Sequence, residues 1–196
     1  EVGLLTIAPG EPESEGLEGL LARARAAEPD LLLAVGGGSV LDGTKFIAAA
    51  APYPESRDAD PWDIVAKGAA VTSAVPLGCV LTLPATGSEM NSFAVISRNS
   101  TREKLAFSSE HVVPLFSILD PETTFSLPTK QVRNGIVDAY VHVMEQYATY
   151  STAAPLQERQ SEAILATLIE EGPKTLKRPK DYKVRANLVW CATQAL

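Results

Sequence analysis

The chain has 196 residues, of which 45% are hydrophobic, and this composition predicts one large or two small folded domains and argues against a disordered chain. Its formal net charge of −7 leaves no basic footprint of the kind that binds nucleic acid or an anionic membrane, so we expect neither as the main partner. A phosphate site in this chain would have to rely on backbone amides and one or two placed cations.

The two cysteines, Cys79 and Cys191, lie far apart in apolar stretches. This placement favours buried thiols in a reducing compartment over a disulfide framework. The first residues do not resemble a signal peptide, and no apolar run approaches the roughly 20 residues of a membrane-spanning helix. We therefore expect a cytoplasmic protein without a membrane partner.

The first quarter of the chain predicts strands that alternate with helices. The expected elements are a strand at 2–7, a helix at 15–27, a strand buried on both faces at 31–35, and a helix at 39–51. Three glycines, Gly36 to Gly38, separate the last strand from the last helix and predict a tight turn between them.

This glycine loop predicts a site for phosphate oxygens, because bare backbone amides and the positive end of a helix dipole meet there. A nucleotide cofactor is the natural occupant. The stretch does not match the usual dinucleotide fingerprint, which would need a third glycine where Leu41 stands, and Thr44-Lys45 reverses the order that a P-loop requires. The alternative is a glycine-rich turn that only joins a strand to a helix.

A second loop rich in small polar side chains, PATGSEMNS, follows a buried strand predicted at 75–83. It brings hydroxyl and amide groups together, although turn and cap chemistry, with Ser88 or Thr86 capping a short helix, would explain the same residues. Next, residues 93–97 and 103–107 flank the turn RNST and predict a β-hairpin. Lys104 lies on its return strand, where a lysine usually faces solvent.

The remaining elements are one more strand at 113–119 and then helices alone, predicted at 130–150, 156–171 and 181–196. Strands alternating with helices, followed only by helices, predict an α/β fold. We expect a nucleotide-binding α/β domain over residues 1–124 and the beginning of an all-helical domain over residues 125–196.

Asp138 and His142 lie four residues apart in the first of these helices, and this spacing places both on one face, one turn from each other. A carboxylate and an imidazole so placed can bind one divalent ion, but a complete site needs one or two further protein ligands. The alternative is that the two side chains hydrogen-bond to each other on a partly buried face.

Three motifs in this order resemble the iron-containing (group III) alcohol dehydrogenase family, and most of all its NADPH-dependent butanol dehydrogenase and aldehyde reductase branch. They are AVGGGSVLDGTKFIAAA, LTLPATGSEMNSFAVISR and LDPETTFSLPTKQVRNGIVDAYVHVMEQY. The resemblance implies a dehydroquinate synthase-like architecture: a dinucleotide-binding α/β domain, then a helical metal-binding domain, with metal and substrate in the cleft between them.

Carried over residue by residue, the resemblance implies a cofactor site that includes the glycine loop. Its expected cofactor-binding residues are Gly37, Gly38, Ser39, Asp42, Thr82, Thr86, Asn91 and Lys104. Asp42 also lines the substrate side and is the expected catalytic residue, while Lys104 is the hairpin lysine that reaches toward the ribose. Phe93 matches a position on the substrate side.

The resemblance also implies the chemistry and the partners. Asp138 and His142 match the first two of four metal ligands for Fe²⁺ or Zn²⁺, and the cofactor is NADP, with NAD as the alternative. The expected activity is hydride transfer between the nicotinamide and a small aldehyde or primary alcohol, in a homo-oligomer, a dimer.

Two departures from the family pattern lead us to expect a fragment truncated at both ends. The two histidines that complete the metal site in the family, and the family's first strand, have no counterpart in this sequence. The alternative functions are a glycerol dehydrogenase or dehydroquinate synthase relative, and a nucleotide-binding fragment without catalysis.

Overall fold

The structure, a computed structural model of the chain, describes residues 4–7, 16–54, 60–98, 101–149 and 153–196. Residues 2–3, 15, 99–100 and 150, which belong to predicted elements or turns, lie outside the described residues. The chain divides into two compact units, one of residues 1–80 and 88–118 and the other of residues 81–87 and 119–196. The boundary expected between residues 124 and 125 remains a prediction.

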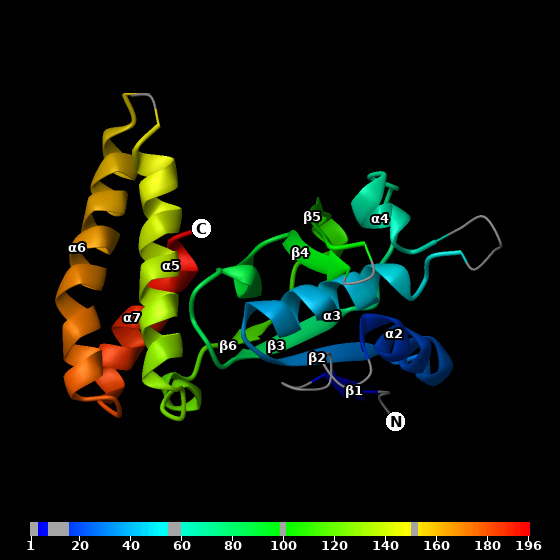
Figure 1. Cartoon of the computed structure of the whole chain (residues 1–196), viewed down its shortest axis with the longest axis horizontal. Coiled ribbons are helices and arrows are strands. Elements are labelled where there is room, and N and C mark those ends of the chain that lie inside the picture. Colours follow the sequence, from blue (N-terminus) through cyan, green and yellow to red (C-terminus); the bar gives the residue numbers. More distant parts are fainter. Residues whose placement is uncertain (1–3, 8–15, 55–59, 99–100, 150–152) are drawn as a thin grey trace. The chain divides into compact units, whose positions relative to one another are not determined.

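The first unit is built on a four-stranded sheet (Figure 1). Its strands follow the order β1-β2-β3-β6 and are β1 (Leu4–Ile7), β2 (Leu31–Gly36), β3 (Leu77–Leu81) and β6 (Ser117–Ile118). β1 pairs with β2 in parallel, and β3 pairs with β6 in parallel. The thiol of Cys79 donates a hydrogen bond to Ser117 Oγ at 3.2 Å between the last two strands. The predicted α/β fold is confirmed, and the structure shows that these strand pairs are parallel.

The helices described with this sheet are α2 (Gly16–Ala27), α3 (Gly38–Ala50) and the short α4 (Asp63–Ala66). α3 packs against both β2 and β4, and therefore almost every residue from Val40 to Ala50 is buried. The guanidinium of Arg25 on α2 donates hydrogen bonds to the carbonyls of Ala50, Ala51 and Tyr53. These bonds stabilise the C-terminal end of α3, where carbonyls lack partners within the helix.

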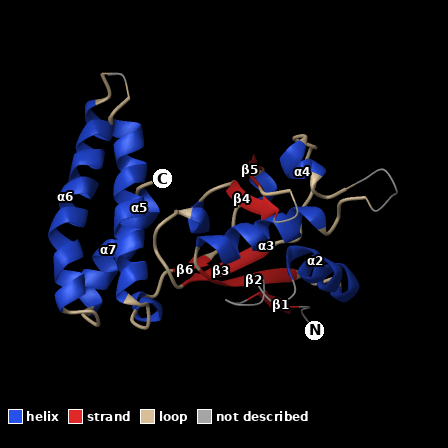
Figure 2. Cartoon of the chain, viewed as in Figure 1, coloured by secondary structure: helices blue, strands red, loops and turns tan. Residues whose placement is uncertain are grey.

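The predicted hairpin is confirmed, with β4 (Phe93–Arg98) antiparallel to β5 (Glu103–Ser108) and Phe93 opposite Ser108. Burial alternates along its strands. Ala94 and Ile96 on β4 and Phe107 on β5 are buried, whereas their neighbours on each strand face outward. The ring of Phe107 meets that of Phe46 on α3 edge to face, with centroids 6.3 Å apart. The hairpin is therefore fixed to α3 by apolar packing. Figure 2 shows β4 next to α3.

Two strand predictions need correction. The strand expected at 113–119 is reduced to Ser117–Ile118, because a 3₁₀ turn, Glu110–Val112, precedes it and Pro114 cannot donate a hydrogen bond to a neighbouring strand. β2 is fully buried on only one face, since the burial of its residues alternates along the strand.

The second unit contains the helices α5 (Thr129–Tyr147), α6 (Pro155–Lys177) and α7 (Tyr182–Gln194), which pack on one another. Their buried residues form one core, made of Ala139, Val143, Leu168, Leu188, Cys191, Ala192 and Ala195. α6 runs six residues beyond its predicted end at 171 and contains Pro173. The helix continues because Gly172 and Thr175 are buried, so packing outweighs the hydrogen bond that proline removes.

Candidate cofactor and metal sites

The glycine loop joins β2 to α3 as predicted. β2 ends at Gly36 and Gly37 is the N-cap of α3. No side chain of the described residues makes a capping hydrogen bond at this N-terminus. A Cβ at Gly36 would lie 2.6 Å from Val40 Cγ2, so glycine there allows the strand end to approach the helix. Gly37 has φ −95° and ψ −168°, a conformation open to any residue. The uncapped amides at this end of α3 can therefore accept an anion.

Asp42 lies one turn further along α3, and both of its carboxylate oxygens accept hydrogen bonds from the loop and strand that follow β3. Oδ1 accepts from Ser88 Oγ at 2.6 Å, and Oδ2 accepts from the backbone N–H of Val95 at 2.9 Å. The carboxylate of the predicted catalytic residue thus joins α3 to both ends of the segment 88–95.

Lys45, which the sequence reading did not include in the site, is the next charged residue of α3 and has no exposed surface (0%). Its ammonium donates three hydrogen bonds: to Asn91 O at 2.8 Å, to Asn91 Oδ1 at 3.0 Å and to Phe93 O at 2.8 Å. An ammonium has three donors, so this group is fully satisfied. The available signal was its position directly before the apolar run from Phe46 to Ala50, because a lysine on a buried helix needs partners.

Burial lowers the pKa of the Lys45 ammonium from 10.5 to about 8, and the nearby groups of Asp42, Glu89 and Cys79 act in the opposite direction. The side chain therefore remains mainly protonated at neutral pH. A buried charge of this kind is tolerated when it is hydrogen-bonded and faces opposite charges.

Asn91 is half-buried, and two donors fix the direction of its side-chain oxygen. Oδ1 accepts from Lys45 Nζ and, at 2.9 Å, from the backbone N–H of Phe93. Because a carboxamide can accept only through its oxygen, these two donors set which end of the amide faces Lys45. The structure thus brings the predicted residues Asp42 and Asn91 into one polar network with Lys45.

Lys104 lies on β5, opposite Ser97, and its side chain is exposed. It makes no hydrogen bond or ion pair with any residue that the structure describes. Phe93 (58% exposed) and Val95 (43% exposed) lie on the same outward face of the hairpin. This face combines a cation with apolar side chains, which suits a ligand with both charged and planar parts.

Thr82 and Thr86 are half-buried and lie in the segment 81–87, which belongs to the helical unit. Their roles, like those of the other predicted site residues, remain predictions.

Asp138 and His142 are both half-buried on α5, one helical turn apart. No hydrogen bond joins the two side chains, and the buried Nδ1 of His142 has no hydrogen-bond partner among the residues that the structure describes. The alternative of a mutually bonded pair is therefore not seen. A buried imidazole nitrogen of this kind, on a residue one helical turn from an aspartate, fits two ligands of a divalent ion. Among the described residues, no group of three or more His, Cys, Asp or Glu side chains could hold a metal.

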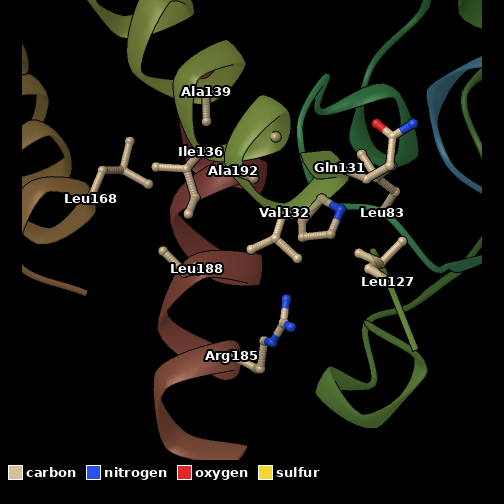
Figure 3. Close-up of a pocket in the computed structure, with 12 residues that line it drawn as sticks. Leu83, Leu127, Gln131, Val132, Ile136, Ala139, Leu168, Arg185, Leu188 and Ala192 are labelled. Carbon is tan, nitrogen blue, oxygen red and sulfur yellow. The ribbon is translucent and has the colours of Figure 1, made fainter. Parts of the chain in front are cut away.

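A mainly apolar pocket lies within the helical unit, between the segment 83–84, α5 and α7 (Figure 3). The guanidinium of Arg185 points into it from α7 toward Val132, and Arg185 is only 3% exposed. Its Nε donates to Pro179 O at 2.9 Å, and burial lowers the pKa of this guanidinium. Asp138 and His142 do not line this pocket, so we do not assign it to the predicted metal site.

In the part of the chain that the structure describes, no helix combines the length and the apolar character needed to cross a membrane.

Known proteins resemble this chain along nearly its whole length. The NADPH-dependent aldehyde reductase YqhD of Escherichia coli strain K12 is 58% identical over 186 residues, which cover 94% of this chain and 48% of that protein. The NADH-dependent butanol dehydrogenase B of Clostridium acetobutylicum is 43% identical over 167 residues, covering 85% of this chain and 42% of that protein. The crystal structure of E. coli YqhD superimposes with a TM-score of 0.92 at 49% identity and covers 98% of this chain and 56% of that chain.

The chain thus spans about half the length of these relatives. The family model described as "Iron-containing alcohol dehydrogenase" matches residues 1–121. A second model, "Fe-containing alcohol dehydrogenase family, C-terminal", matches residues 133–196. The chain belongs to the iron-containing alcohol dehydrogenase family.

Proposed function

We propose that this chain provides the nicotinamide cofactor site and half of the metal site of an oxidoreductase that transfers a hydride between NADPH or NADH and a small aldehyde or primary alcohol. The observation that carries the proposal is the uncapped N-terminus of α3 after a buried strand, with Asp42 and Asn91 joined in one polar network beside it. The names of the two relatives support the substrate class and favour it over glycerol or dehydroquinate.

The first unit would bind the cofactor through complementary contacts. The amides of Gly38 and Ser39 at the start of α3 are placed for the pyrophosphate, and the exposed Lys104 supplies a cation for the ribose and phosphates. The more similar relative is named for NADPH and the other for NADH, so we propose NADPH with NADH as the alternative. The cofactor supplies the hydride, and the protein supplies binding and orientation.

The second unit would contribute Asp138 and His142 as ligands of a divalent ion. The unpaired Nδ1 of His142 supports this role, because a buried nitrogen without a partner is otherwise unfavourable. When bound, such an ion acts as a Lewis acid toward a carbonyl or alkoxide oxygen. The family name favours Fe²⁺, and Zn²⁺ is the alternative.

We propose the cytoplasm as the location, which two free, buried cysteines support. A homodimer is the proposed assembly, and sedimentation analysis of the purified chain tests it.

A second candidate is a nucleotide-binding fragment without catalysis. The incomplete metal site among the described residues favours it. NADPH titration followed by an aldehyde-reduction assay separates the two candidates. NADPH binding with turnover, in this chain or in one extended to the length of the relatives, supports the oxidoreductase. Binding without turnover in the extended chain supports the second candidate, and no binding in either contradicts both.

A further inference from the structure

We propose that Lys45 is a positioning residue for cofactor binding: its buried ammonium holds Asn91 and the start of β4 in the conformation that binds the nicotinamide cofactor. The inference rests on the proposed function, because it assigns a role to a residue through the predicted cofactor site.

The ammonium of Lys45 makes all of its hydrogen bonds with one segment of the chain, residues 91–93. All three hydrogen bonds from Lys45 Nζ go to Asn91 and Phe93, which are 46 and 48 residues away in the sequence. Two of the acceptors are backbone carbonyls, so these bonds fix the path of the chain as well as a side chain. The third fixes Asn91 Oδ1.

Asp42 and Lys45 bind different parts of the segment 88–95. Asp42 accepts from Ser88 and Val95 at its two ends, whereas Lys45 donates to Asn91 and Phe93 in its middle. Both residues belong to α3, whose N-terminus carries the predicted pyrophosphate site. The helix therefore sets the distance between the glycine loop and Asn91.

A purely apolar side chain of the same length would fill the space but remove the donor that the carbonyls of Asn91 and Phe93 and the side-chain oxygen of Asn91 share in Lys45. Before β4 begins at Phe93, the only regular element of the segment 88–92 is one short 3₁₀ turn, Ser88–Met90. Loss of the Lys45 bonds should therefore release Asn91 and Phe93 while the packing of α3 against the sheet persists.

The charge of Lys45 depends on pH. The groups that face it are Asp42 on the same helix, Glu89 on the 3₁₀ turn and Cys79 on β3. Because the pKa of its ammonium is about 8, deprotonation above that pH removes one of three donors. NADPH affinity should therefore fall as the pH rises through this value.

The experiment compares the unsubstituted chain with Lys45→Met and with Thr44→Val as a matched control. Thr44 is equally buried on α3, but its hydroxyl donates to Val40 O within its own helix, so its replacement leaves the segment 88–93 untouched. NADPH affinity is measured by cofactor fluorescence, and amide exchange at Phe93 and Val95 is measured by NMR.

We expect Lys45→Met to bind NADPH at least about tenfold more weakly and to exchange both amides faster, while Thr44→Val stays within about twofold of the unsubstituted chain. A folded Lys45→Met with unchanged NADPH affinity would overturn the inference and leave the proposed function standing. Failure of the unsubstituted chain to bind NADPH would overturn the proposed function and the inference with it. If Lys45→Met does not fold, the pH profile of the unsubstituted chain decides: a fall in affinity near pH 8 supports the inference, and a flat profile contradicts it.

Discussion

Two buried glycines of the helical unit, Gly135 on α5 and Gly172 on α6, should respond in opposite directions to replacement by alanine. In a helix interior this exchange alone stabilises by about 1 kcal/mol, because alanine loses less backbone entropy. At Gly172 the new Cβ would meet Ile136 Cγ2 at 3.4 Å, which is an ordinary contact. Gly172→Ala should therefore retain most of this stabilisation.

At Gly135 the new Cβ would lie 2.5 Å from Pro84 O, a backbone atom that no side-chain rotation can move away. Either α5 or the segment 81–87 must shift, and overpacking of this kind costs about 1–3 kcal/mol. After the stabilisation of about 1 kcal/mol from the glycine-to-alanine exchange is subtracted, we expect Gly135→Ala to lower the free energy of unfolding by up to about 2 kcal/mol. Gly172→Ala should raise it by up to about 1 kcal/mol.

Urea unfolding followed by far-UV circular dichroism measures both variants against the unsubstituted chain. A change of midpoint in opposite directions, with the same denaturant dependence, supports the close approach of α5 to Pro84. Stabilisation by both substitutions, or an equal loss in both, would show that this approach is wrong.

Three further predictions concern the candidate sites. The pKa of Lys45 is about 8 in the folded chain and about 10.5 when exposed, so between these pH values the unfolded chain binds more protons than the folded chain. The free energy of unfolding should therefore rise with pH over this range, by on the order of 3 kcal/mol. Urea unfolding at about pH 8 and about pH 10.5 spans this range, and Lys45→Met should lack the rise. An identical rise in the variant would refute the assignment. Lys104→Met should raise the Michaelis constant for NADPH more than that for the aldehyde in an active, extended chain; equal effects would indicate a solvated lysine. Asp138 and His142 should retain a divalent ion only weakly, and metal analysis after dialysis should find less than one ion per chain; one tightly held ion in the double variant Asp138→Asn, His142→Gln would place the metal elsewhere.

Local sequence signals were sufficient for much of the fold. The hairpin followed from two alternating runs around a turn, and its buried face confirms the pattern. The glycine loop followed from an apolar run that ends in three glycines, and the structure starts α3 at Gly38. The C-terminal end of α6 could not be predicted from the local sequence, because the burial of Gly172 and Thr175 overrides the helix-breaking signal of Pro173.

The polar network of the first unit depends on contacts that no local pattern contains. Asp42 meets Val95 across 53 residues, and Lys45 meets Asn91 across 46. The family resemblance named Asp42 and Asn91 but gave no reason to join them. Lys45 was missed because a lysine is ordinarily exposed, and only the packing of α3 between β2 and β4 shows that this one is buried.

The central claim is that the N-terminus of α3 binds the pyrophosphate of a nicotinamide cofactor, and NADPH titration of the chain with and without Gly38→Val tests it most directly. A side chain at this position would obstruct an anion that approaches the backbone amides. The account predicts saturable binding at one NADPH per chain, and affinity at least about tenfold weaker in a Gly38→Val variant with an unchanged circular dichroism spectrum. Equal NADPH affinity in the folded variant would contradict the account.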